Sequence, residues 1–295
     1  PNTVNLDGLT PANVRAFFAD SKNASRGMNV YDPYVRYAAM NISKGHMDNL
    51  TLRKAVFFAI NTQALIDLSG GLVYYGEPGD NPVKPVLGLD YTKTTGNIHD
   101  PNWKITGNPD YAKSLVESIK TSDPAAYKKA TVDGITLDVR QSVVLNDTIP
   151  IVEAAMAKVG IKVKWNIISA GYYSTVMNPA KQNDMSASGW GADWANASTV
   201  IPELFTTAGG FNLTQNSDDP NYKAFEDRVA VAMKTTDRKK QAAMWKALDK
   251  EAAGYFWHMP TLFGKAQEVW GSALQNVFFW VPQGNPAYGK IWIKQ

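Results

Sequence analysis

Cysteine is absent from the 295 residues of the chain. This absence excludes disulfide bonds, thiolate catalysis and any zinc site that uses cysteine ligands. Histidine is scarce as well: His46, His99 and His258 are far apart in the sequence and form no HExxH pair. Because zinc sites normally show paired ligand spacing, each of these histidines is better interpreted as structural. We therefore predict neither a metal site nor a cofactor.

Long apolar runs and strong charge are also missing. No apolar run approaches the roughly 18 to 20 residues that cross a bilayer. The formal net charge is only +3, and the cationic residues 238–240 are interpreted as a solvated helix face. Nucleic acids and anionic membranes favour a concentrated basic patch, so we predict no nucleic-acid partner. The chain opens without a signal peptide, on polar residues 1–3, as a processed or trimmed protein does.

Common catalytic motifs are not found either. The sequence has no GxxxxGK[ST] phosphate loop and no GxSxG nucleophile turn. Carboxylates are plentiful, but nothing in the sequence selects a pair for acid–base work. An enzyme such as a hydrolase is therefore the less favoured alternative.

The clearest structural pattern lies between residues 134 and 168. Apolar residues alternate over 135–139 and again over 161–167, as in strands, and a helical pattern with cap residues 146–148 lies between them. Strand, helix and strand at this spacing predict a βαβ unit with parallel strands and a right-handed crossover.

The other predicted elements are of both kinds. Helices are expected to begin at the caps Thr10, Asn49, Asn61 and Asp110, and two more are expected over 222–234 and 238–253. Strands are expected over 37–42, over 185–190 and in parts of 259–292. Irregular chain is expected over 23–32 and 76–109. The sequence thus predicts an α/β fold with a mixed sheet.

Residues 188–194, Ser-Gly-Trp-Gly-Ala-Asp-Trp, directly follow a predicted strand. Glycines at a strand end let a guest approach the backbone, and the two indoles offer flat apolar walls. Asp193 could accept hydrogen bonds from an ammonium group. The structural alternative is that Asp193 caps a helical stretch up to Phe205 while both indoles fill a core.

This segment resembles the GW-x-A-D-[WY] signature of the peptide/nickel class of ABC-transporter extracellular solute-binding proteins, family 5. Four further segments resemble that family in the correct order: residues 40–61 with LRKAV and AIN, 108–115 with NPDYAKSL, 156–163 with MAKVGIKV, and 219–238 with DP, FED and TDR. The similarity covers about residues 40 to 240.

The resemblance implies a type II periplasmic-binding-protein fold: a lobe with a mixed sheet flanked by helices, plus a remnant of the first lobe. It assigns residues 1–41 to that remnant, 42–280 to the second, ligand-binding lobe, and 281–295 to a return segment, with the chain as the carboxy-terminal portion of a longer protein. It also implies an extracytoplasmic monomer, lipid-anchored through a preceding part, that delivers its ligand to a membrane permease.

The resemblance further implies a ligand site. Asp193 corresponds to the aspartate that pairs with a peptide's amino group, and Trp190 to a ligand-contacting tryptophan, with Gly191 and Trp194 beside them. Arg140 is the candidate receptor for a ligand carboxylate. The family often continues with Asp-Pro after the aspartate, whereas this chain reads Ala-Asn-Ala at 195–197.

The sequence therefore predicts a binding component of an ABC importer that captures a peptide or similar small solute. The alternatives are a sensor of the same fold and a protein that binds another solute, such as a sugar or a metal complex.

Overall fold

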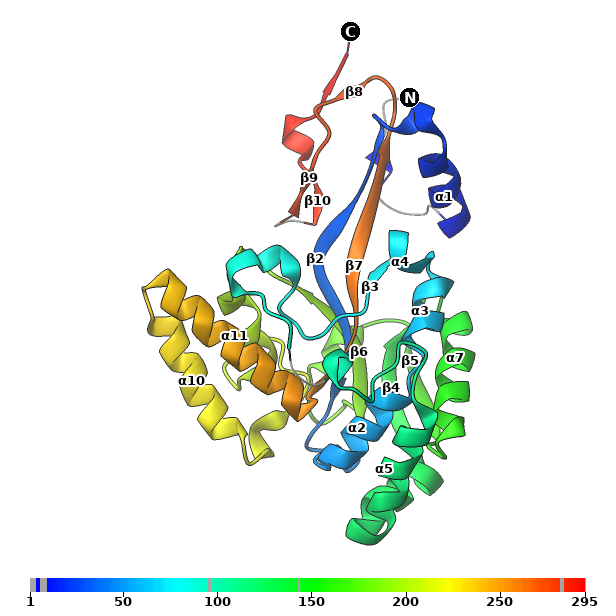
Figure 1. Cartoon of the computed structure of the whole chain (residues 1–295), viewed down its shortest axis with the longest axis vertical. Coiled ribbons are helices and arrows are strands. Elements are labelled where there is room, and N and C mark those ends of the chain that lie inside the picture. The colour runs from blue at the N-terminus through cyan, green and yellow to red at the C-terminus, as the bar shows by residue number, and fades with distance from the viewer. Residues whose placement is uncertain (1–3, 6–9, 95–96, 143, 282–283, 295) are drawn as a thin grey trace.

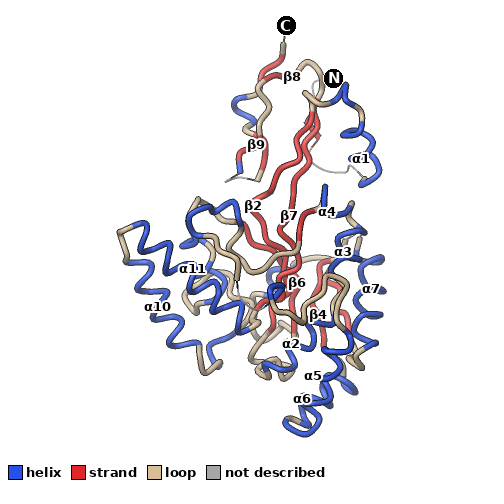
Figure 2. The backbone as a smooth tube through the Cα atoms, viewed as in Figure 1, coloured by secondary structure: helices blue, strands red, loops and turns tan. Residues whose placement is uncertain are grey.

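The computed structural model describes residues 4–5, 10–94, 97–142, 144–281 and 284–294. It has a large α/β body and a smaller upper part that holds both ends of the chain (Figure 1). Strands run through the centre of the body, and helices cover its sides (Figure 2).

The strands in chain order are β1 Val4–Asn5, β2 Gly27–Met40, β3 Gly76–Glu77, β4 Ile135–Arg140, β5 Val163–Ile168, β6 Met185–Gly191, β7 His258–Trp270, β8 Leu274–Gln275, β9 Phe279–Trp280, β10 Asn285–Pro286 and β11 Trp292–Ile293.

The α-helices are α1 Pro11–Ala19, α2 Leu50–Ala59, α3 Thr62–Leu68, α4 Gly71–Tyr74, α5 Pro109–Ser122, α6 Pro124–Lys128, α7 Leu145–Lys158, α8 Tyr172–Val176, α9 Ile201–Phe205, α10 Tyr222–Lys234 and α11 Arg238–Tyr255.

The main sheet is mixed, in the order β1-β7-β2-β6-β4-β5, with β3 paired to β7. Strand β4 is parallel to β5, with Ile135 opposite Val163, which confirms the predicted βαβ unit. It is also parallel to β6, with Leu137 opposite Met185. Strands β2 and β7 are antiparallel to their neighbours. The predicted α/β fold with a mixed sheet is confirmed.

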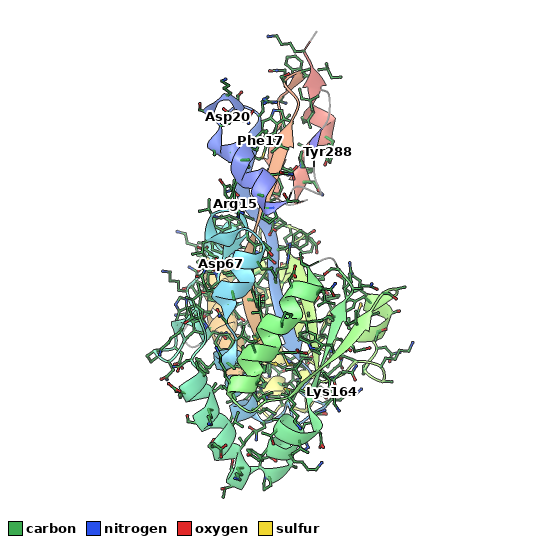
Figure 3. All side chains as sticks on the ribbon, turned by 90° about the vertical axis from the view of Figure 1, so that its right-hand side faces the viewer. Arg15, Phe17, Asp20, Asp67, Lys164 and Tyr288 are labelled. Carbon is green, nitrogen blue, oxygen red and sulfur yellow. The ribbon has the colours of Figure 1, made fainter. Side chains whose placement is uncertain are left out.

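Two long strands connect the body to the upper part. Strands β2 and β7 leave the sheet together and reach α1 on one side and the segment from β8 to β11 on the other (Figure 1). Figure 3 accordingly places Phe17 and Tyr288 in the upper part, and Lys164 of β5 in the body.

Residues 23–32 were predicted to be irregular because they are polar and contain glycine, and this prediction was wrong from Gly27 onward. Strand β2 begins at Gly27, which lies opposite Val269 of β7. Pairing with a partner more than 240 residues away in the sequence makes this segment a strand, so the local composition could not reveal it.

Side-chain caps begin several helices as expected. The side chains of Thr10, Asn49 and Asn61 accept hydrogen bonds from backbone N–H groups in the first turns of α1, α2 and α3. The expected cap Asp110 was wrong by two residues, because the side chain of Asn108 caps α5.

The predicted cap at residues 146–148 was also wrong. Helix α7 begins at Leu145, so these residues lie inside its first turn, and the residue before the helix makes no capping hydrogen bond. The irregular stretch over residues 76–109 is confirmed apart from the two-residue strand β3 and short 3-10 turns.

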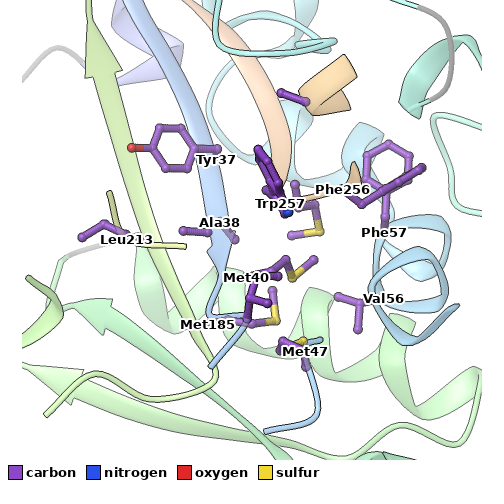
Figure 4. Packing of buried hydrophobic residues seen from close by; sticks show 14 of the residues in the cluster. Tyr37, Ala38, Met40, Met47, Val56, Phe57, Met185, Leu213, Phe256 and Trp257 are labelled. Atoms are coloured by element: carbon purple, nitrogen blue, oxygen red, sulfur yellow. The ribbon is translucent and has the colours of Figure 1, made fainter. Parts of the chain in front are cut away.

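The core lies where the sheet meets its helices. Met40 and Met47 are fully buried, and Met185 and Trp257 pack in the same cluster (Figure 4). Trp245 is also fully buried. Across the described ranges, no helix is both long enough and apolar enough to cross a membrane.

Candidate ligand-binding site

The predicted site residues lie at one edge of the sheet. Arg140 ends β4 and Gly191 ends β6. Because these two strands are parallel, their carboxyl ends meet at the same edge. In open α/β sheets ligands bind outside the carboxyl ends of the strands, so this edge is the expected place for a site.

Arg140 is held at this edge by two aromatic rings. Its guanidinium carbon lies 5.5 Å from the ring centre of Tyr172 and 4.9 Å from that of Tyr173. These distances suit cation–π attraction, which orients the charge without neutralising it. Arg140 is exposed and forms no ion pair with the described residues, so its charge is available to a ligand.

Tyr172 fixes the strands beneath Arg140. Its hydroxyl donates to the backbone oxygen of Asp138 on β4, at 3.2 Å, and to that of Ala187 on β6. Burial raises the pKa of Tyr172, so the hydroxyl stays protonated and remains a donor.

Trp190 is partly built into the protein. Its indole N–H donates to the backbone oxygen of Thr199 at 2.8 Å, and its ring lies 5.1 Å from that of Phe211. Phe211 in turn lies 5.6 Å from Tyr173. We call Tyr173, Phe211 and Trp190 the aromatic row, since it runs from the ring beneath Arg140, on α8, to β6. One face of Trp190 is therefore occupied by Phe211, as the structural interpretation of this residue proposed.

Asp193 follows β6 and is exposed. Its Oδ2 accepts a hydrogen bond from the Thr199 hydroxyl at 2.8 Å, and its N–H donates to the same hydroxyl at 3.3 Å. Helix α9 begins only at Ile201 without a side-chain cap, so the alternative role of Asp193 as the cap of this stretch was wrong. The carboxylate is exposed and lacks an ion pair within the described part of the chain.

Trp194 and Gly191 complete the signature segment. Trp194 is 56% exposed, which argues against a core role, and its indole N–H donates to Ser198 Oγ at 3.1 Å. A side chain at Gly191 would start 2.8 Å from ring atoms of Tyr34, so this ring would have to move to admit one.

A cavity of about 500 Å³ lies beside this edge. Ala38 and Ala187 are cross-strand neighbours on its floor, and Gly189 follows two residues later on β6. These small side chains leave space between the sheet and the helices α3 and α7, and we call this space the hollow. Arg140 and Tyr173 line both the hollow and the edge, so the two are continuous.

The edge therefore presents charges of opposite sign, a cation at the end of β4 and an anion after β6. Among the described residues, no three histidine, aspartate or glutamate side chains lie together in a way that could hold a metal ion.

Residues that the sequence did not single out also belong to this region. Arg36 lines the hollow, and Tyr173 and Phe211 form the aromatic row. They come from segments distant in sequence, and no local motif marks them. The adjacent tyrosines 172 and 173 were the only available signal.

The mixed sheet and its flanking helices form the fold of a type II periplasmic binding protein. The sequence profile described as "Bacterial extracellular solute-binding proteins, family 5 Middle" matches residues 5–212. The chain belongs to this family.

Curated relatives include glutathione-binding proteins. The protein GsiB of Shigella flexneri is 24% identical over 216 residues, which cover 72% of this chain and 39% of the relative. GsiB of Pectobacterium atrosepticum is 24% identical over 227 residues, or 75% of this chain and 41% of the relative.

Solved structures share the fold. Clavulanic acid biosynthesis oligopeptide binding protein 2 superposes with a TM-score of 0.78 at 20% identity, over 98% of this chain and 52% of that one. Haemophilus influenzae OppA, in complex with the peptide RPPGFSPFR, gives 0.76 at 14% identity, over 99% and 54%. NikA from Brucella suis, in complex with Fe(III)-EDTA, gives 0.77 at 15% identity, over 99% and 57%.

The chain spans about two fifths of the length of these curated relatives and about half of that of the solved structures.

Proposed function

We propose that this chain is part of the substrate-binding component of an ABC importer, which captures a peptide or similar small solute between two lobes and delivers it to a membrane permease. The observation that supports this function most is the pair of exposed opposite charges, Arg140 and Asp193, at the carboxyl edge of the sheet. A zwitterionic peptide has the matching charges at its two ends.

The proposed roles follow from these positions. Asp193 receives the amino group of the ligand, while Thr199 holds one oxygen of the carboxylate in place. Arg140 receives a ligand carboxylate from its place over Tyr173. Trp194, exposed beside Asp193, provides the apolar wall, and Gly191 lets the backbone come close. Trp190 contacts the ligand by the face that Phe211 leaves free.

We also propose the lobes suggested by the sequence: residues 1–41 and 281–295 belong to a first lobe and residues 42–280 to a second. The shared course of β2 and β7 between the upper part and the body supports a hinge there (Figure 1). The protein acts as an extracytoplasmic monomer, anchored by lipid, without a nucleic-acid partner and without catalysis of its own.

The amine anchor can be tested with peptides and their N-acetylated forms. Asp193→Asn removes the charge but keeps an oxygen for Thr199, so the fold should persist. We expect the variant to bind an equimolar mixture of di- and tripeptides at least about tenfold more weakly, because a charge-assisted hydrogen bond is lost. N-acetylation of the peptides should weaken their binding to the wild-type protein by the same factor, and should not change their binding to Asp193→Asn. Native mass spectrometry of the bound peptides reports both.

Asp110→Asn, at an exposed aspartate in the first turn of α5, is the matched control and should bind as the wild type. Equal affinity of Asp193→Asn and wild type for free peptides would remove Asp193 from the site.

A further inference from the structure

Apart from Arg140, which it shares with the edge, the hollow has no role in the anchoring of the ligand ends described above. Its floor is apolar and made of small side chains, Ala38, Ala187 and Gly189. Leu65 of α3 and Leu145 and Val152 of α7 add apolar walls. Burial of apolar surface in such a space stabilises a complex by about 25 cal/mol per Å². The hollow can thus accept an apolar group of a ligand.

Arg36 gives one side of this hollow a positive charge. It lies opposite Gly189 in the antiparallel pair of β2 and β6. A side chain at Gly189 would start 3.4 Å from Cδ and 3.5 Å from Nη1 of Arg36. The arginine side chain therefore lies over the bare backbone of β6 at Gly189.

The charge of Arg36 is only weakly compensated. Its guanidinium lies 3.5 Å from Asp32 Oδ2, and the arginine side chain is 43% exposed. The same aspartate forms a closer ion pair, at 3.1 Å, with the buried ammonium of Lys84. Two cations thus share the Asp32 carboxylate, and Glu77 is the other acidic group that acts on Lys84.

The charged residues among those that line the hollow are all cations. The lining includes two arginines, Arg36 and Arg140, and the described residues that form it include neither aspartate nor glutamate. An apolar space with cations at its margin favours an apolar group that carries an anion, and disfavours one that carries an amine.

We propose that the hollow is a second subsite, for an apolar group that bears an anion such as a carboxylate, with Arg36 as the residue that selects the anion. This inference rests on the proposed function and narrows it to acidic amphipathic solutes, because a cationic group at this position would meet two arginines.

A matched pair of fluorescent probes tests the subsite. Anilinonaphthalene sulfonate is an apolar anion, and phenylnaphthylamine has the same rings without the sulfonate. Both are titrated into the intact folded protein. We expect Arg36→Gln to weaken binding of the sulfonate about tenfold, since a charge-assisted contact is lost, and to change binding of the neutral probe by less than about twofold. Arg36→Lys should restore part of the affinity for the sulfonate.

A second variant tests the space itself. Ala187→Leu fills the floor of the hollow and should weaken the binding of both probes at least about tenfold, because their rings no longer fit there. The control variants are Arg15→Gln, at an exposed arginine of α1, and Ala154→Leu, at an exposed alanine of α7. Both should bind the probes as the wild type does.

Two results would overturn the subsite. The first is that Arg36→Gln and Ala187→Leu bind the sulfonate with wild-type affinity. The second is that Arg36→Gln loses affinity for both probes equally. Peptide binding by the same wild-type protein keeps the proposed function separate. If the wild type binds peptides but the variants bind the probes as the wild type does, only the subsite assignment is wrong. If no peptide or other solute binds the wild type, the proposed function fails, and the subsite assignment fails with it.

Discussion

Lys84→Ala is expected to lower the free energy of unfolding by about 3 to 5 kcal/mol, the usual loss when one partner of a buried ion pair is removed. Lys84 is 1% exposed. Its ammonium donates to the backbone oxygens of Asp32 at 2.6 Å, Tyr34 at 2.7 Å and Gly264 at 3.1 Å, and to Asp32 Oδ1 at 3.1 Å. Alanine would leave a buried carboxylate and three carbonyl oxygens without this donor.

The position of these contacts explains why they matter. The register of β2 against β7 shifts between Tyr31 and Val35, and Pro33 lies within this irregularity. The backbone there cannot complete a regular ladder, so Lys84 supplies the missing donor. Burial lowers the pKa of Lys84 to about 8, while Asp32 opposes that shift, so the amine is still mainly charged at pH 7.

Chemical denaturation of the variants measures this effect. Lys84→Met combined with Asp32→Asn removes both charges and should recover part of the stability lost in Lys84→Met alone. The exposed Lys223, paired with Asp227 on α10, provides the control Lys223→Ala, which should unfold as the wild type. A loss in Lys84→Ala no larger than that in the control would contradict the role given to this lysine.

Acid is expected to destabilise the protein through His258. The imidazole is fully buried between two rings, with Tyr37 at 4.0 Å and Phe205 at 4.6 Å. Neither ring nitrogen has a hydrogen-bond partner among the described residues. Burial lowers the pKa of His258 from 6.5 to about 3, so the folded protein holds the neutral form.

The direction of the pH effect follows from this shift. In the unfolded chain His258 takes up a proton near pH 6.5, while in the folded protein it does so only near pH 3. Its contribution to stability is therefore fully present above pH 6.5 and is lost as the pH falls towards 3. At about 1.4 kcal/mol per pH unit, the loss is about 2 kcal/mol by pH 5 and about 5 kcal/mol over the whole range.

His258→Phe keeps the stacked ring and removes the titration. The variant should be at least as stable as the wild type at pH 7, because two unpaired nitrogens disappear, and should lose about 2 kcal/mol less between pH 6.5 and 5. Unfolding curves at the two pH values give the comparison. Ala154→Leu, at an exposed residue that does not titrate, is the control and should keep the wild-type slope. Parallel pH dependence of His258→Phe and wild type would show that His258 is not the source.

Local signals were sufficient for much of the fold. The unit from β4 to β5 is marked by alternation, helical spacing and a closing glycine at residue 160, all within one short segment. Caps at Asn49 and Asn61 likewise act within one helical turn, so the residues that mark a helix are also those that stabilise it.

Features made by distant segments could not be predicted in this way. Residues 27–32 become a strand only through β7. Arg36 enters the hollow because Gly189, on another strand, has no side chain. The signature segment combined both situations: its glycines were interpretable locally, whereas the exposure of Trp194 and the packing of Trp190 against Phe211 were not.

The most direct test of solute capture is native mass spectrometry of the intact protein, purified without denaturation. We predict a heterogeneous set of small masses that leave on unfolding and fragment as peptides, with acidic and apolar members prominent. A protein that carries no such mass, and that also fails to bind the peptide mixture, would contradict the account.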